Sequence, residues 1–304
     1  MGRPKLGIFD SERSEKGNSM FKKILIANRG AIATRIIRTL KKMQISSVAL
    51  ASEADRASLH VQQADEVIFL EGNAATETYL NVPLILEKAK ELGVDAIHPG
   101  YGFLSENASF AENCQHLGIT FLDPEPQHIR DFGLKHIARD LAIQAKVPLL
   151  PGSELLNSID HALEEANRIG YPVMLKSSAG GGGIGMQRCD TPQILADAYE
   201  QVARMSQNAF GQNDLFLEKF VVNARHLEIQ IFGDGQGKVV SFGERDCSLQ
   251  RRNQKVVEET PAVGIDRSQI AEMEAHAIRL GELVNYKSAG TVEYVYDADD
   301  QQYY

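Results

Sequence analysis

The stretch from Val173 to Met186 joins a short apolar run, ending in Lys176, to a loop with almost no side chains. Four consecutive glycines occupy positions 180–183. A glycine run is unfavourable inside a helix or strand because ordering it costs more backbone entropy than ordering other residues. Its bare N–H groups can close over an anion, and a lysine adds a compact charge that suits phosphate. The combination favours a phosphate-binding loop over a flexible hairpin turn.

A second set of polar side chains alternates with apolar ones along a predicted strand. His226, Glu228 and Gln230 are separated by Leu227 and Ile229, so the three polar residues share one face. Such a face is usually solvated. Here further polar runs follow at 244–246 and 250–255, and the whole set is more typical of a lined cleft.

The overall composition limits the classes of function. The 304 residues are 43% hydrophobic and 24% charged, as in an ordinary globular protein with room for two domains. The net charge of −9 argues against nucleic-acid binding, and no apolar run approaches the ~18 residues of a membrane span. The three cysteines are scattered and have no metal-site spacing, which favours a reducing, cytoplasmic location.

The first half alternates between strand and helix patterns. Residues 1–20 are polar without periodicity, and we expect a disordered leader there. From residue 21 the alternation predicts a parallel sheet of the dinucleotide-binding type. The glycine fingerprint of nicotinamide enzymes is absent after the first strand, which argues against an oxidoreductase. Strands are expected at 21–27, 47–52, 66–70, 94–97 and 119–122, and helices at about 78–92 and 107–117. A further helix after the first strand is indicated by the spacing of Ile32, Ile36, Ile37 and Leu40.

The second half must position the glycine loop and the polar cleft. One helix is expected over about 129–145, and on composition alone its Lys135 would be a solvated helix residue. Prolines end this segment, and a small unit containing the glycine loop follows. A strand at 214–220 then brings Glu218 and Lys219.

The last elements carry one further carboxylate. We expect a helix at 266–283 and a strand at 291–296 that bears Glu293. A turn at 297–300 would lead into a returning strand at 301–304, which covers little of its neighbour. The strand of Glu293 therefore lacks most of one pairing partner, and we interpret the sequence as C-terminally truncated.

These motifs together resemble the biotin carboxylase domain of biotin-dependent carboxylases, which are enzymes of the ATP-grasp fold. The resemblance covers residues 20–304. It is carried by the glycine loop, Glu218-Lys219, His226-x-Glu228-x-Gln230, and the runs at 26–30, 54–60, 98–107 and 250–255. It implies an α/β protein with an N-terminal, Rossmann-like pre-ATP-grasp domain at 21–134. An incomplete ATP-grasp domain at 135–304 would follow, with a lid at about 150–220.

A few positions resemble the urea carboxylase (urea amidolyase) branch of this family. Ile184 stands in the glycine loop where the family usually has arginine, and Asn253 stands where it usually has histidine. The runs at 132–136 and 149–152 also look like urea carboxylase. The substitution at Asn253 puts in doubt the ATP contact normally made by that histidine.

The resemblance implies a reaction and roles for particular residues. ATP and bicarbonate would form carboxyphosphate, and the carboxyl group would then pass to biotin. Phosphoryl transfer of this kind depends mainly on positioning and charge neutralisation. The matching positions are Lys135 and Lys176 for phosphate, Gly182 and Gly183 for the closing lid, Glu218, Lys219 and Val221 for adenine, His226, Gln250 and Asn253 for the nucleotide pocket, Lys255 for bicarbonate, and Glu293 for Mg²⁺ or Mn²⁺.

The resemblance also implies partners and leaves alternatives open. The biotin would be carried on a biotinylated carrier domain, with a carboxyltransferase region as the next partner, and family members often form homodimers. A further metal-bridging glutamate and other groups would lie beyond residue 304, so the activity of this chain alone is in doubt. The alternatives are a different ATP-grasp ligase and a non-catalytic nucleotide-binding remnant.

Overall fold

The computed structural model describes residues 21–178, 185–251 and 254–304. The expected leader at 1–20, the glycines Gly182 and Gly183, and the positions Ile184 and Asn253 lie outside these ranges. In the described part, no helix has the length and apolar character needed to span a membrane.

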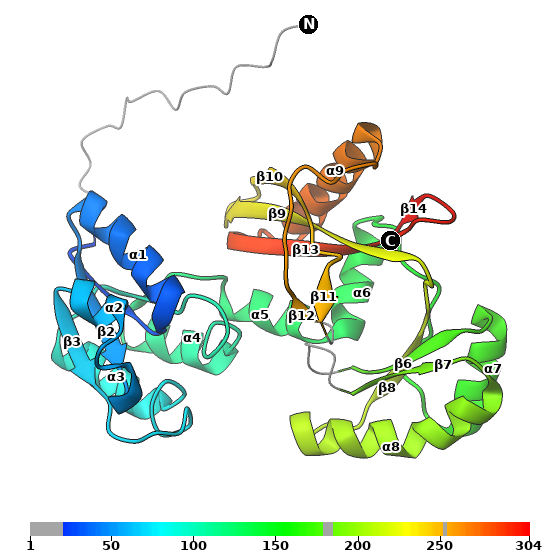
Figure 1. Cartoon of the computed structure of the whole chain (residues 1–304), viewed down its shortest axis with the longest axis horizontal. Coiled ribbons are helices and arrows are strands. Elements are labelled where there is room, and N and C mark those ends of the chain that lie inside the picture. Colours follow the sequence, from blue (N-terminus) through cyan, green and yellow to red (C-terminus); the bar gives the residue numbers. More distant parts are fainter. Residues whose placement is uncertain (1–20, 179–184, 252–253) are drawn as a thin grey trace, which may run out of the picture.

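The N-terminal domain is built on a five-stranded sheet with every strand parallel to its neighbours. The parallel pairing confirms the parallel sheet expected from the alternation of strands and helices. The strand order is β3-β2-β1-β4-β5, which reverses direction between β1 and β4. Figure 1 shows the helices wrapped around this sheet at one end of the molecule. Its elements are β1 (Lys23–Ile26), α1 (Gly30–Met43), β2 (Ser46–Ala51), a 3₁₀ turn (Glu53–Asp55), α2 (Leu59–Gln63), β3 (Glu66–Phe69), α3 (Val82–Glu91), β4 (Ala96–His98), α4 (Ala108–His116) and β5 (Thr120–Phe121).

Helix α3 begins four residues later than the sequence pattern predicted. Asn81 caps it, because its side-chain oxygen accepts a hydrogen bond from the N–H of Leu84 at 3.2 Å. Pro83 lies in the first turn, where its missing N–H costs nothing. The cap and the proline together fix the start of the helix, and residues 78–81 form a turn before it.

The single helix expected over 129–145 is wrong, because the structure has two. Helices α5 (Pro126–Gly133) and α6 (Lys135–Gln144) are separated by Leu134, whose backbone is extended at φ −108° and ψ 115°. The N–H of Lys135 donates to the carbonyl of Ser178 at 3.2 Å, a contact 43 positions along the chain. This tertiary hydrogen bond accompanies the break and places Lys135 in the first turn of α6.

A smaller unit follows, which we call the lid. It is a three-stranded antiparallel sheet of order β7-β6-β8, covered by α7 and α8. Its buried apolar core includes Val173, Leu175, Leu195 and Leu217. The elements are α7 (Ile159–Ile169), β6 (Val173–Ser177), β7 (Met186–Cys189), α8 (Pro192–Phe210) and β8 (Leu215–Lys219).

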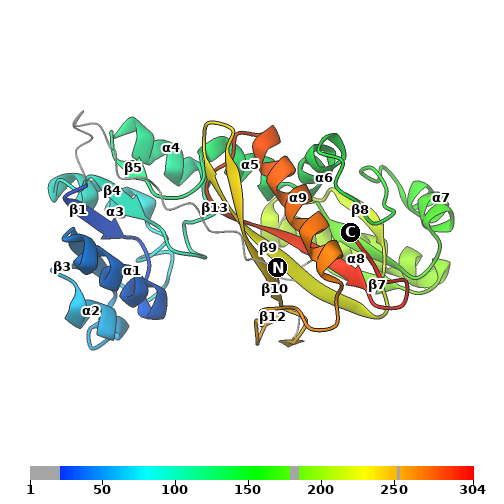
Figure 2. The ribbon, with the colours of Figure 1, turned by 90° about the horizontal axis from the view of Figure 1, so that it is seen from above.

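The central sheet has the order β10-β9-β13-β14 and is antiparallel. Helix α9 packs on one face of this sheet, and Figures 1 and 2 show the sheet between the N-terminal domain and the lid. The expected returning strand is confirmed, since β14 pairs with β13 at Tyr296 and Asp297. The elements are β9 (Ala224–Asp234), β10 (Val239–Asp246), β11 (Gln250–Arg251), β12 (Gln254–Lys255), α9 (Arg267–Leu283), β13 (Lys287–Asp297) and β14 (Gln302–Tyr303).

The N-terminal core provides a stability test with two matched leucines. Leu25 on β1 is 0% exposed, whereas Leu117 at the end of α4 is 43% exposed. We expect Leu25→Ala to lower the free energy of unfolding by about 2–5 kcal/mol, because it removes buried surface and leaves a cavity. Leu117→Ala should change it by less than about 0.5 kcal/mol. Urea unfolding of both variants checks this, and equal losses would contradict the assigned core.

Candidate functional site

The first half of the site is built on the pairing of β9, β10 and β13. Glu228 on β9 stands opposite Glu293 on β13 and opposite Arg245 on β10. The Glu228 side chain is only 2% exposed. It accepts hydrogen bonds from Arg245, at 2.5 Å, and from Lys255. Burial alone would raise the pKa of Glu228, but these two cations outweigh it and hold the pKa below its usual range.

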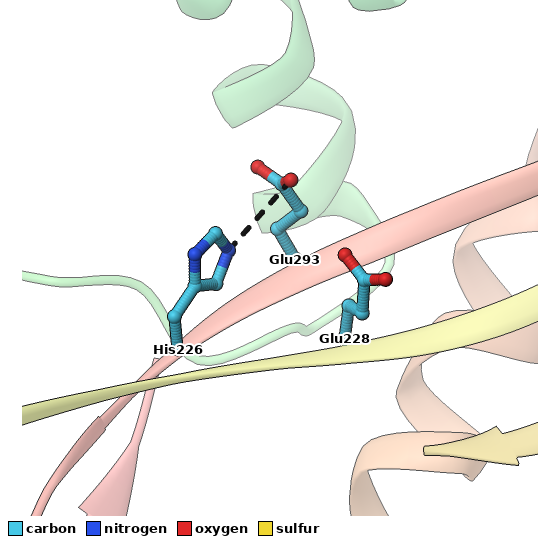
Figure 3. Close-up of side chains that lie close together, drawn as sticks. All are labelled: His226, Glu228 and Glu293. Atoms are coloured by element: carbon cyan, nitrogen blue, oxygen red, sulfur yellow. Dashed lines mark ion pairs between the residues drawn. The ribbon is translucent and has the colours of Figure 1, made fainter. Parts of the chain in front are cut away.

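Lys255 also joins Glu228 to Glu293. Its ammonium lies 2.8 Å from Glu293 Oε1, and His226 Nε2 lies 3.7 Å from the same oxygen. The nearby His226 and Lys255 lower the pKa of Glu293 to about 2, although partial burial opposes the shift. Burial also works against the charge of Lys255, yet its hydrogen bonds to the two carboxylates raise its pKa. Figure 3 shows His226, Glu228 and Glu293 projecting from the same face of the sheet.

Gln250 extends this group to the β11–β12 hairpin. Its amide lies 2.6 Å from His226 Nδ1 and also donates to the carbonyl of Cys247 at 3.0 Å. The structure thus brings four of the predicted site residues together: His226, Gln250, Lys255 and Glu293.

The second half of the site lies between helix α6 and the lid. Glu218 on β8 is 14% exposed in its side chain and has a cation at each oxygen. Arg139 Nη1 donates to Oε1 at 2.8 Å, and Lys176 Nζ donates to Oε2. Burial favours protonation of Glu218, but Lys176 and Arg139 hold its pKa below the usual range.

Lys135 lies beside this cluster on α6. Burial and the positive charge of Lys176 both lower its pKa. In the described part of the chain, its ammonium has no hydrogen bond or ion pair, and it is only partly exposed. The expectation from composition, a solvated helix lysine, is therefore wrong. The nearby carboxylates of Glu218 and Glu293 act in the opposite direction on Lys135. Because Lys135 has no bonded partner among the described residues, it is suited, together with Lys176, to binding a further anion.

The side chains expected near adenine already make contacts in the lid or with α6, or are buried. Lys219 Nζ donates to the carbonyls of Gly170 and Tyr171 at 2.8 and 3.0 Å, and Val221 is buried just after β8. With Glu218 bound to two cations, all three side chains have partners or burial in the structure as it stands. Their expected contact with a base stays a prediction.

The last described residue before the glycine segment lies next to Lys135. This residue, Ser178, accepts the Lys135 N–H, and its hydroxyl lies 2.7 Å from His136 Nδ1. Ser178 therefore lies at the first turn of α6, a position that the sequence pattern did not indicate.

Three charged side chains at this site were absent from the predicted site residues. The sequence pattern marks Glu228 only as part of a polar face, and Arg245 only as part of a polar run. In the antiparallel pairing of β9 with β10, Glu228 lies directly opposite Arg245. Knowing which residues of the two strands are paired would therefore have identified both. Arg139 gives no signal, because a helical arginine is ordinarily a solvated residue.

Comparison with known families assigns the class of protein. Residues 135–304 match the family described as "Carbamoyl-phosphate synthase L chain, ATP binding domain", in agreement with an ATP-grasp fold. Residues 20–129 match "Biotin carboxylase, N-terminal domain". The chain belongs to the biotin carboxylase family.

Individual relatives agree with this assignment. The chain is 50% identical to "Urea amidolyase" of Lachancea kluyveri over 97% of its own length and 16% of that protein. It is 45% identical to "Biotin carboxylase 1" of Bacillus subtilis over 94% of its own length and 64% of that protein. It thus spans less than two thirds of each of these relatives.

A solved structure matches with a TM-score of 0.89 at 43% identity, over 94% of this chain and 63% of the other. It is the biotin carboxylase domain dimer of the Hydrogenobacter thermophilus 2-oxoglutarate carboxylase, in complex with MgADP, ADP and bicarbonate.

Glu228 gives a pH-dependent prediction. We expect Glu228→Gln to lower the free energy of unfolding by about 3 kcal/mol at pH 7, because it leaves Arg245 and Lys255 without their buried partner. The folded pKa lies below the ordinary 4.5, so the stabilisation is present above pH 4.5. It is lost as the pH falls through the folded value, and the deficit of the variant should shrink there.

The measurement is urea unfolding of both proteins between pH 7 and pH 3. Glu258→Gln is the matched control, since Glu258 lies 3.2 Å from the same Arg245 but is 48% exposed. It should cost less than about 1 kcal/mol. A deficit for Glu228→Gln that stays constant with pH would show that its carboxylate charge does not stabilise the fold.

Proposed function

We propose that this chain is the biotin carboxylase part of an ATP- and Mg²⁺-dependent ligase, which carboxylates biotin with bicarbonate through carboxyphosphate. The observation that carries the proposal is the pair of neighbouring ammonium groups, Lys135 and Lys176. Lys176 is bonded to Glu218, whereas Lys135 has no hydrogen bond or ion pair among the described residues. Such an excess of positive charge, beside a glycine segment, is suited to the triphosphate of ATP.

The residues of the site divide the work of the reaction. Lys135 and Lys176 neutralise the phosphates from two sides, and Gly182 and Gly183 close over them to exclude water from a labile intermediate. Lys255 keeps its proton, because its pKa is raised, and supplies a fixed charge for bicarbonate and carboxyphosphate. Glu218, Lys219 and Val221 border the adenine, and His226, Gln250 and Asn253 line the rest of the nucleotide pocket.

Glu293 is the residue proposed to hold the metal. Ligand atoms of His226, Glu228 and Glu293 lie within 4.8 Å of one another. Both oxygens of Glu228 are bonded to cations, whereas Glu293 is 57% exposed and uses one oxygen. This fits Mg²⁺, which takes one or two carboxylates together with phosphate oxygens, and Mn²⁺ accepts the same ligands. When bound, the metal neutralises charge on the phosphates.

The branch of the family and the partners are proposed from the relatives rather than from the site. The 50% identity to a urea amidolyase, with Ile184 and Asn253 at their positions, supports the urea carboxylase branch. We accordingly propose a biotinylated carrier domain and a carboxyltransferase region as partners, and a homodimer like the one named for the Hydrogenobacter domain. The proposed domains are residues 21–134 and 135–304, with the lid at about 150–220.

The function is tested by ADP release from Mg-ATP. We expect release to require bicarbonate and to increase with free biotin, in this chain or in one extended past residue 304 to include the further groups that the resemblance implies. Lys176→Met and Lys135→Met should each lower the rate about 100-fold, since each removes a charge that stabilises the transferring phosphoryl group. Lys88→Met is the control, because Lys88 pairs with Glu91 on α3 and should be silent.

Two outcomes separate the alternatives. Nucleotide binding without biotin-stimulated release would favour a non-catalytic nucleotide-binding protein. Release that does not depend on bicarbonate would favour a different ATP-grasp ligase. Either result would contradict the proposed carboxylation by this chain.

The metal site is tested separately by Glu293→Gln. We expect the Mg²⁺ concentration needed for half-maximal Mg-ADP binding to rise roughly 10-fold or more, because the amide oxygen is a weaker ligand than the carboxylate. Calorimetric titrations at several Mg²⁺ concentrations measure this, with Glu258→Gln as the control. An unchanged requirement in Glu293→Gln would exclude this carboxylate as a ligand.

A further inference from the structure

We propose that Arg139 is a positioning residue that frees Lys176 for the nucleotide. It would do so by keeping the Glu218 carboxylate neutralised when Lys176 moves to the phosphates. This inference rests on the proposed function, and it assigns a task to a side chain that is not expected to touch any substrate itself.

The geometry creates a competition for Lys176. In the structure its ammonium is bonded to Glu218 Oε2, whereas the proposed reaction needs the same ammonium on phosphate oxygens. A carboxylate that is largely buried is costly to leave without a cation. If Lys176 were the sole partner of Glu218, nucleotide binding would have to overcome that cost.

Arg139 removes this obstacle because it bonds the other oxygen of the carboxylate. Its Nη1 donates to Oε1 at 2.8 Å, so Glu218 retains one full counter-charge after Lys176 leaves. A guanidinium is suited to this task since it stays protonated at any working pH and has several donors in a rigid plane.

The guanidinium is also held in place independently of Lys176. Its Nη2 donates to the carbonyl of Leu150 at 3.2 Å. A Cβ atom at Gly152 would approach that nitrogen to 2.7 Å, so the absence of a side chain at Gly152 leaves the space that Arg139 uses. These contacts fix Arg139 between α6 and the lid, whatever Lys176 is bonded to.

Helix α6 then unites two tasks. Lys135 in its first turn is near enough to Lys176 for the two charges to repel, and Arg139 lies one turn further along, where residues four apart share a face. The cluster therefore holds three cations, Lys135, Lys176 and Arg139, against Glu218 and against Glu293, which is already paired with Lys255. The surplus positive charge favours a polyphosphate. Arg139 lets Lys176 bind it without leaving the buried carboxylate of Glu218 unpaired.

The test is a double-mutant cycle on the affinity for Mg-ADP, measured by calorimetry with the full chain. Arg139→Met should weaken binding about 10-fold or more, because Lys176 is then the only cation bonded to Glu218 and must leave it unpaired to bind the nucleotide. Glu218→Gln in the same background should restore binding to within about threefold of Glu218→Gln alone, since an amide leaves no charge behind. Arg139→Lys should retain part of the affinity.

Two results would contradict the role proposed for Arg139. If the effects of Arg139→Met and Glu218→Gln simply multiply, Arg139 supports the lid but does not free Lys176, and the inference is overturned while the proposed function stands. The same holds if Arg139→Met binds Mg-ADP as tightly as the unaltered chain. Melting temperatures of all variants show whether any of them has failed to fold.

A second measurement needs no nucleotide and separates this inference from the proposed function. Trace labelling with acetic anhydride, read by mass spectrometry, reports how tightly each lysine holds its proton. Lys176 should react several-fold more slowly in Arg139→Met and faster in Glu218→Gln, while Lys88 should be unchanged. If Arg139→Met leaves the labelling of Lys176 unaltered, the shared carboxylate does not couple the two cations. Failure of the unaltered chain to bind Mg-ADP would instead contradict the proposed function.

Discussion

The pairing of β9 with β13 is the constraint on which the site depends. The two strands are in register over eleven residues, from Ala224 opposite Asp297 to Asp234 opposite Lys287. One face of this pair carries Leu227, Ile229 and Tyr294 into the core beneath α9. The other face carries the polar side chains of the site. A slip of one residue would exchange the two faces, so the hydrophobic core also fixes the arrangement of the charges.

The same pairing explains why the charges on this face come as a network. Glu228 and Glu293 stand directly opposite each other, and two carboxylates at that spacing repel. Lys255 bridges them, and Arg245 takes the remaining oxygen of Glu228. The β11–β12 hairpin is needed for this arrangement, because it brings Lys255 back over the sheet.

The sequence predicted this face well and the α6 region poorly, for a physical reason. Alternation of polar and apolar residues is a local property, so the residue order alone places His226, Glu228 and Gln230 on one face. The break at Leu134 accompanies a hydrogen bond to Ser178, which no pattern around residue 134 can reveal. The partners of Arg139 and Lys176 depend equally on how the lid docks. The roles expected for Gly182, Gly183 and Asn253 stay predictions.

The distribution of charge explains how an acidic chain can bind a polyphosphate. The net charge of −9 is spread over the whole molecule, and in physiological salt a charge is felt over only about 8 Å. Lys176 and Arg139 are bonded to Glu218, with Lys135 beside them, whereas Glu228 and Glu293 are paired with Lys255 and Arg245. One half of the site therefore has more cations than carboxylates, whereas Glu258 adds a third carboxylate to the other half. On the proposed function, a triphosphate would enter with its charge toward α6 and the lid.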